Sequence, residues 1–281
     1  MTAASVPAPA PASVRTISGL RSALRVFWFG GLMSYGMLFN WARPSIYIPT
    51  LIGGPTFQLL FFAALGSYAT DRSPAYFAIG NAVQVSALSG VFGMTMAIAN
   101  ERWFGTLPAL LATPANRIAL FAGRFLPFVF NGLLVSLYAV AFGMLFLGVR
   151  LEPSTLLVFG LALLTTVFSC TAIGALQGAI SLRLRDGLFG ANLITLAILL
   201  FCGVNVPVAE LPGWMQVVGN LLPFTHGLEA VRQAADGAGL AQVGGLIALE
   251  LLVGVVYATA AFGLFSYLER SARQNATLDV R

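Results

Sequence analysis

The residue types that carry out chemistry are scarce in this sequence. Glu250 is an acid in the middle of an apolar stretch, GGLIALELLVG, and a charged side chain at membrane depth costs about 2.5–3.5 kcal/mol on insertion scales. Such an acid either has a function, in which case it faces a substrate path or a partner helix or is protonated, or it hydrogen-bonds within a helix bundle for packing alone. Both interpretations stay open. His226 is the only histidine, so we expect no multi-histidine metal site within one chain. We interpret it as a hydrogen-bonded structural residue and expect no catalytic residue, because no partner nucleophile or base is evident nearby.

The basic residues exclude one class of site. All fifteen are arginine, and lysine is absent. A P-loop, the phosphate-binding loop of many ATPases, requires a lysine that reaches the terminal phosphates of the nucleotide, so this chain cannot contain one. The arginines stand at the ends of apolar runs and do not form one basic face, so we expect no nucleic acid partner. Cys170 and Cys202 are interpreted as small buried hydrophobic residues.

The elements that must position these residues are membrane helices. Hydrophobic residues make up 58% of the chain and charged residues 9%, whereas charged residues make up about a quarter of a soluble domain. A helix needs about 20 apolar residues to cross a membrane. The sequence therefore predicts an all-α membrane protein with six transmembrane helices in residues 45–270: Ile46–Ala69, Tyr76–Ala99, Ile118–Val149, Thr155–Leu182, Leu188–Val208 and Gln242–Leu268.

The two ends of the chain differ from this core. Residues 1–13 are rich in proline and alanine and are predicted to be a disordered tail. Within residues 14–44, the apolar run Val26–Phe39 is too short to span a membrane. We expect an amphipathic helix that lies in the cytoplasmic interface, with Arg15, Arg21 and Arg25 towards lipid head groups; a seventh spanning helix is the alternative. Residues 271–281 are predicted to be a cytoplasmic tail.

The arginines also predict the orientation. If the N-terminus is cytoplasmic, three of the fifteen arginines, Arg72, Arg150 and Arg232, fall in outer segments and the other twelve in inner ones. Positive residues are enriched in cytoplasmic loops of membrane proteins. Both termini are therefore predicted to be cytoplasmic.

The longest inner connection is Asn100–Arg117, NERWFGTLPALLATPANR. Its first residues end the second span, and Gly105 and Thr106 break the helix. Thr106 can cap a new turn that starts at Leu107, and Thr113-Pro114 ends that turn because the residue before proline avoids helical geometry. The stretch predicts a short helix on the membrane surface, with an ordinary interfacial loop as the alternative.

The longest outer connection is Ala209–Ala241, and it contains the segment Glu210–Gly237. Its apolar pieces, Trp214–Leu222 and Gly227–Ala235, are each too short to span and are separated by Pro223. Short helices that dip into a membrane need surrounding protein to satisfy their backbone groups, so the segment predicts a re-entrant helical hairpin. Glu229 and Arg232 are three residues apart and can pair on one face of the second helix.

These two connections resemble a known family. The run Glu101-Arg102, Gly105-Thr106-Leu107, Leu111 and Thr113-Pro114 is similar to the exit of the second span in ABC type-2 exporter permeases. The segment Val206–Arg232 is similar to the family's signature before the last span, and Trp41–Pro44 is similar to the entry into the first. The resemblance extends from about Arg15 to Leu268 and looks closest to the daunorubicin-resistance and nodulation-factor export permeases.

The resemblance implies a set of partners. Such a permease pairs with a second permease copy, as a homodimer or heterodimer, and with two copies of a separate ABC ATPase that binds ATP and Mg²⁺; membrane lipids surround it. The surface helix would dock on the ATPase, and the hairpin would close the outer end of the path. The implied coupling residues are Glu101, Arg102, Gly105, Thr106, Leu107, Leu110 and Leu111, and the implied external gate residues are Pro212, Trp214, Pro223, His226, Glu229 and Arg232.

These expectations describe a permease subunit without its own ATPase site, cofactor or metal. It would export an amphiphilic drug, polyketide, lipid or lipid-linked glycoside across the bacterial plasma membrane, with antibiotic resistance as one outcome. The alternative is a secondary carrier or channel that uses Glu250 for proton coupling, although carriers usually contain internal repeats and none is apparent. The lack of a His, Cys or acid cluster at one membrane face disfavours an integral membrane enzyme.

Overall fold

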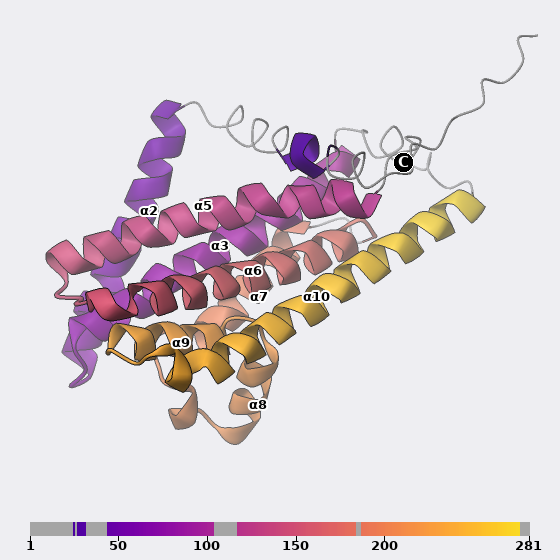
Figure 1. Cartoon of the computed structure of the whole chain (residues 1–281). Coiled ribbons are helices and arrows are strands. Elements are labelled where there is room, and N and C mark those ends of the chain that lie inside the picture. The colour runs from indigo at the N-terminus through magenta and orange to yellow at the C-terminus, as the bar shows by residue number, and fades with distance from the viewer. Residues whose placement is uncertain (1–24, 26, 32–43, 104–116, 184–186, 276–281) are drawn as a thin grey trace, which may run out of the picture.

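The computed structural model describes residues 25, 27–31, 44–103, 117–183 and 187–275 (Figure 1). Every regular element in these ranges is a helix, which confirms the predicted all-α class for this part of the chain. Five of the described helices are long and apolar enough to cross a membrane. They are α2 (Pro44–Ala69), α3 (Pro74–Trp103), α5 (Arg117–Phe146), α6 (Leu156–Ser181) and α10 (Leu240–Asn275).

The fifth expected span, Leu188–Val208, is only partly helical. Helix α7 (Gly187–Phe201) has 15 residues, which reach roughly 22 Å, less than a hydrocarbon core of about 30 Å. The chain then turns at Gly203, whose φ is +80°, and continues to the short 3₁₀ helix η2 (Val208–Glu210). Six full-length spans are therefore not confirmed, because apolar residues after Phe201 belong to a turn that composition alone does not reveal.

Helices α3 and α6 form the centre of the bundle. They are the most buried of the long helices, whereas α2 and α10 are the least buried. Glycines let their backbones approach: a Cβ atom built at Gly174 of α6 would lie 2.7 Å from the carbonyl oxygen of Gly90 of α3. Close approach at small residues is the usual way in which membrane helices gain packing contacts. The bundle is therefore organised around one tightly packed helix pair.

Polar side chains join the helices inside this apolar bundle. The Asn81 Nδ2 group of α3 donates a hydrogen bond to Asn205 Oδ1 over 2.9 Å, and Gln58 Nε2 of α2 donates to Asn81 Oδ1 over 3.2 Å. The hydroxyl of Ser136 of α5 donates to the carbonyl of Ala82 over 2.8 Å. Hydrogen bonds of this kind tie membrane helices together where no solvent competes.

Much of the cytoplasmic side expected from the sequence lies outside the described residues. Residues 1–13, Arg15, Arg21, Gly105, Thr106, Leu107, Leu110 and Leu111 are in this group. Glu101 and Arg102 belong to the last turn of α3, and their side chains are not described. Arg25 is exposed and helical. Residues 27–31 are helical and pack on α5, since a Cβ atom at Gly31 would lie 2.8 Å from the carbonyl oxygen of Gly123.

Candidate functional site

Two short helices stand where the sequence predicts them. They are α8 (Gly213–Leu221) and α9 (Thr225–Ala235), and residues 222–224 connect them. We call residues 213–235 the hairpin. Helices α3, α6 and α10 all begin at the same end of the bundle, which we call the hairpin end. Figure 1 shows α9 alongside α6 and α10, with which it packs, and α8 projecting away from them.

Proline and backbone strain shape the hairpin. Pro212 precedes α8 with an extended backbone, and Pro223 lies in the apex, where it stops α8 from continuing. Phe224 has a φ of +119°, and it is the one residue other than glycine with a positive φ among the described residues. Its side chain is fully buried. A strained backbone of this kind persists only where surrounding contacts hold it in place.

Glu250 of α10 supplies contacts that hold this apex. Its carboxylate accepts hydrogen bonds from the backbone N–H of Phe224 over 2.7 Å and of Gly227 over 2.9 Å. The hydroxyl of Ser169 of α6 also donates to it. The first N–H groups of a helix lack partners within the helix, and a carboxylate satisfies them and suits the positive end of the helix dipole. The structure thus shows the buried acid bonded within the bundle.

The C-terminus of α8 is satisfied in a complementary way. The carbonyl of Gly219 accepts from the Thr225 hydroxyl, and the carbonyl of Asn220 accepts from His226 Nε2 over 3.2 Å. The carbonyl of Leu221 accepts from the Tyr257 hydroxyl of α10 over 3.2 Å. These carbonyls would otherwise be unpaired at a helix end. Both facing helix ends at the apex therefore have side-chain partners.

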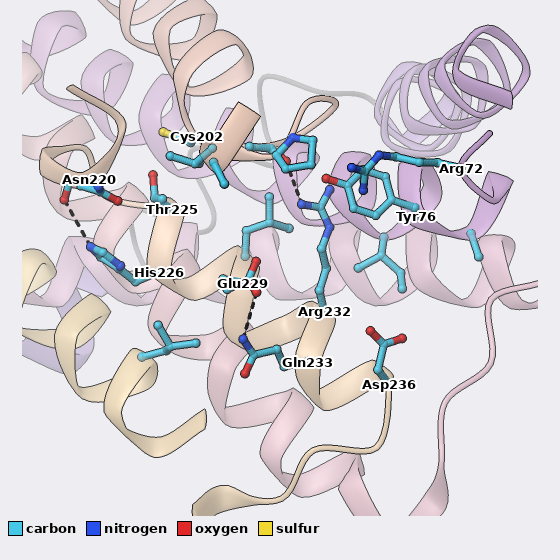
Figure 2. Close-up of a pocket in the computed structure, with 18 of the residues that line it drawn as sticks. Arg72, Tyr76, Cys202, Asn220, Thr225, His226, Glu229, Arg232, Gln233 and Asp236 are labelled. Atoms are coloured by element: carbon cyan, nitrogen blue, oxygen red, sulfur yellow. Dashed lines mark hydrogen bonds between the residues drawn. The ribbon is translucent and has the colours of Figure 1, made fainter. Parts of the chain in front are cut away.

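A cavity of about 720 Å³ opens beside the hairpin, between the start of α3, the turn after α7 and α9 (Figure 2). Pockets that bind small molecules usually have volumes of about 300–1,000 Å³. Leu246 of α10 also lines it, whereas Glu250 does not. The polar side chains labelled around it are Arg72, Tyr76, Asn220, Thr225, His226, Glu229, Arg232, Gln233 and Asp236.

Arg232 joins three elements at this cavity. Its Nη1 and Nη2 groups donate to the carbonyls of Gly203 and Val204, each over 2.7 Å. Its guanidinium lies over the ring of Tyr76 of α3 with a distance of 3.8 Å to the centroid (Figure 2). Burial lowers the pKa of this guanidinium from its ordinary value, while Tyr76 and Glu229 oppose that shift. A planar guanidinium suits this site because it can donate twice and stack at the same time.

The ion pair expected between Glu229 and Arg232 is replaced by other contacts. Arg232 is directed to the turn after α7, and Glu229 Oε1 accepts a hydrogen bond from Gln233 Nε2 over 2.9 Å. The ion pair in this region joins Arg72 to Glu210. It connects the segment before α3 with η2 at the edge of the cavity. Spacing along one helix did not reveal it, because its partners are far apart in the sequence.

The six expected gate residues do not form one cluster. His226, Glu229 and Arg232 line the cavity, and Pro223 is buried in the apex. Pro212 is exposed, and so is Trp214, whose ring makes an edge contact with that of Phe201 at 5.9 Å between centroids. Sequence reasoning missed Tyr76, although Arg72, which lies 4.9 Å from its ring centroid, was marked as one of three outer arginines.

The other candidate ligands are buried or scattered. Cys170 and Cys202 are free and buried, as predicted. Within the described ranges, no group of three His, Cys, Asp or Glu side chains is arranged to hold a metal ion.

Comparison with known proteins places this arrangement in context. Residues 29–235 match the model of the ABC-2 type transporter family. The match covers most of the chain and runs from the segment that packs on α5 to the last residue of α9. No curated protein sequence matches the chain.

Proposed function

Because this chain belongs to the ABC-2 type transporter family, we propose that it is the permease subunit of an ATP-driven exporter. The family match and the apolar helices identify a multi-pass membrane transport component that is not itself an ATPase. The observation that carries the proposal is the complete absence of lysine from a chain of this family. Because a P-loop needs a lysine, these 281 residues contain no P-loop, and we propose that a separate ABC ATPase provides the energy for transport, with two copies serving a permease dimer.

The path of α7 supports a sixth crossing. A Cβ atom at Gly187, where α7 begins, would lie 3.2 Å from the Cβ of Ala99 near the end of α3. A Cβ atom at Gly80, near the start of α3, would meet the carbonyl of Val204 after α7. Residues 80–99 of α3 extend over roughly 28 Å. Helix α7 and the turn after it thus traverse nearly the full depth of the bundle, which favours six crossings with both termini on one side.

The arginine distribution supports a cytoplasmic position for the side on which both termini would lie. The hairpin end then faces outwards and would form the external gate, with the 720 Å³ cavity beside the hairpin. The ATPase would bind at the opposite end. It would contact the interfacial segment that contains Arg15, Arg21 and Arg25, and the connection Asn100–Arg117, which we call the coupling stretch. The coupling residues proposed there are Glu101, Arg102, Gly105, Thr106, Leu107, Leu110 and Leu111.

The exposed helices support a second permease copy. Phe57, Phe61 and Tyr68 of α2 are 74%, 60% and 94% exposed, and apolar faces of this size need lipid or protein against them. We propose that the transport path runs between two copies in the bacterial plasma membrane. The substrate class would be an amphiphilic drug, polyketide, lipid or lipid-linked glycoside, and efflux of a drug would confer resistance.

The contacts of Glu250 argue against the carrier alternative. A proton-coupling acid has to exchange protons with a path, whereas Glu250 is fully buried and has two backbone donors and one hydroxyl donor. It also does not line the cavity. No described contact favours proton coupling as a second function.

Co-purification tests the proposal. The permease is expressed with an ABC ATPase that has Walker motifs, taken from the neighbouring reading frame where that frame encodes one, and a tag on the permease is used for purification. We expect a complex with equal numbers of the two subunits that hydrolyses ATP. A permease that purifies without the ATPase, and transports its substrate in its absence, would overturn the proposal.

A further inference from the structure

We propose that Glu250 is the positioning residue of the hairpin. Its carboxylate fixes α9 to α6 and α10, so that opening of the cavity displaces α8 and leaves α9 in place. The fixing of α9 does not depend on what the protein transports. The displacement of α8 during opening rests on the proposed function, and the two parts are tested separately below.

Helix α9 is fixed at both ends and along its length. Glu250 binds its N-terminus, and Arg232 binds the turn after α7 near its C-terminus. Gly227 fits directly against α6 and α10, because a Cβ atom there would overlap the hydroxyl of Thr166 and lie 3.0 Å from Glu250 Cγ. The inward face of the helix is fully or almost fully buried and consists of Leu228, Ala230, Val231 and Ala234.

Helix α8 has far fewer contacts. Gly219 is its one buried residue, and the side chains of Trp214, Val217 and Leu221 are 62%, 61% and 66% exposed. At its C-terminus, Gly219, Asn220 and Leu221 accept three side-chain hydrogen bonds. Elsewhere, Gln216 Nε2 donates to the carbonyls of Ala209 and Leu211 in the segment before α8, and the Trp214 ring makes an edge contact with Phe201. Segments with few buried apolar contacts open locally before well-packed ones. The hairpin therefore consists of one fixed helix and one loosely held helix that share an apex.

The site requires a carboxylate and not merely a polar group. Glu250 Oε1 accepts from the N–H of Phe224 and from Ser169, whereas Oε2 accepts from the N–H of Gly227. A glutamine has a single acceptor oxygen, and its NH₂ group would face a donor. Glu250→Gln therefore leaves a backbone donor unpaired in a fully buried position.

Cys202 is a native cysteine whose accessibility reports whether the hairpin is packed against the bundle. It is 1% exposed and lines the cavity together with Thr225, the first residue of α9. A Cβ atom at Gly219 of α8 would meet the carbonyl of the adjacent Phe201. In a Cys170→Ser background, Cys202 is the only cysteine. Its rate of reaction with a maleimide then reports displacement of the apex.

The first experiment measures this rate for the permease in lipid nanodiscs without ATP. We expect Glu250→Gln to raise the labelling rate of Cys202 at least tenfold. Ser169→Ala removes only one of the three donors and should raise it two- to fivefold. Glu152→Gln, which changes an exposed acid outside the hairpin, should leave it within twofold. Gel filtration shows which variants are folded.

A folded Glu250→Gln variant with the labelling rate of the parent would overturn the positioning role. If that variant does not fold, Ser169→Ala decides, and parental labelling of this variant would likewise overturn the role. Because this experiment contains neither ATP nor substrate, its result is independent of the proposed function.

The second experiment compares two reporters in the permease–ATPase complex trapped with ATP and vanadate. We expect Cys202 to become reactive while a cysteine at the buried position Val231 of α9, in a Cys170→Ser/Cys202→Ser background, stays protected. Reactivity at both positions would overturn the assignment of α9 as the fixed helix. Protection at both would overturn the displacement of α8.

Discussion

The guanidinium of Arg232 lies 3.8 Å from the centroid of the Tyr76 ring while its two terminal nitrogens bind the carbonyls of Gly203 and Val204. One side chain thus connects α9 with α3 and with the turn that ends α7. Arg232→Lys should destabilise the protein by about 1.5–3 kcal/mol, because a lysine cannot keep both charged hydrogen bonds and the stacking. Thermal unfolding in detergent measures this, with the exposed Arg150→Lys as the matched control. Equal unfolding temperatures for both variants would contradict it.

Substitutions at Tyr76 separate the contribution of its ring to stability from that of its hydroxyl. The Tyr76 hydroxyl is buried and has no hydrogen-bond partner among the described residues. Tyr76→Phe keeps the ring under Arg232 and removes an unsatisfied polar group, so the unfolding temperature should stay the same or rise slightly. Tyr76→Leu removes the stacking surface and should lower it. The same measurement checks both variants, and a clear loss of stability in Tyr76→Phe would show that the hydroxyl has a partner.

Gly227 tests the close packing of α9. Gly227→Ala should cost about 1–3 kcal/mol because the new methyl group overlaps the Thr166 hydroxyl and crowds Glu250. Adding Thr166→Ala should recover part of the loss, since the remaining Cβ of residue 166 would lie 2.9 Å from the new methyl group. The control is Gly245→Ala, because nothing lies within 4 Å of a Cβ atom there. Denaturation of all four proteins gives the comparison, and a stable Gly227→Ala single variant would refute the packing.

The sequence predicted the hairpin helices well but not what holds them. Short apolar pieces separated by Pro223 locate α8 and α9, and the cost of a buried acid draws attention to Glu250. Its partners are backbone N–H groups 23 and 26 residues earlier in the chain. Every residue except proline has such a group, so residue types give no signal for them.

Two predictions from the sequence differ from the structure for related reasons. The spacing of Glu229 and Arg232 predicts an ion pair. The guanidinium of Arg232 instead donates to the carbonyls of Gly203 and Val204, because the fold brings the turn after α7 against α9. The apolar residues after Phe201 look like a continuing span, yet Gly203 adopts a positive φ and ends it. In both cases the deciding contact depends on tertiary packing and not on local pattern.

The ion pair between Arg72 and Glu210 should affect opening more than stability. These side chains are 38% and 56% exposed, and exposed pairs contribute about 0–1 kcal/mol. Arg72→Glu or Glu210→Arg alone should leave the unfolding temperature nearly unchanged but raise the labelling rate of Cys202, because η2 is released from the segment before α3. The double exchange should restore slow labelling. If the double exchange labels as fast as the single variants, the pair does not hold the segment.

The coupling stretch can be tested without knowledge of the substrate. Replacing Gly105-Thr106-Leu107 with three alanines should abolish co-purification of the ATPase or its stimulation by the permease, since Thr106 is proposed to cap the docking helix that starts at Leu107. Membrane insertion, checked by the amount of permease that stays in alkali-washed membranes, should be unaffected. An equally active complex would exclude this stretch as the coupling element.

Transport into inside-out membrane vesicles tests the central claim most directly. Vesicles that contain the permease and its ATPase are given a fluorescent amphiphilic substrate, with ATP or with an imposed pH gradient. We predict uptake that requires ATP, is lost when the Walker lysine of the ATPase is replaced, and persists when an uncoupler collapses the pH gradient. Uptake driven by the pH gradient without ATP, and abolished by Glu250→Gln, would contradict the account and identify a proton-coupled carrier.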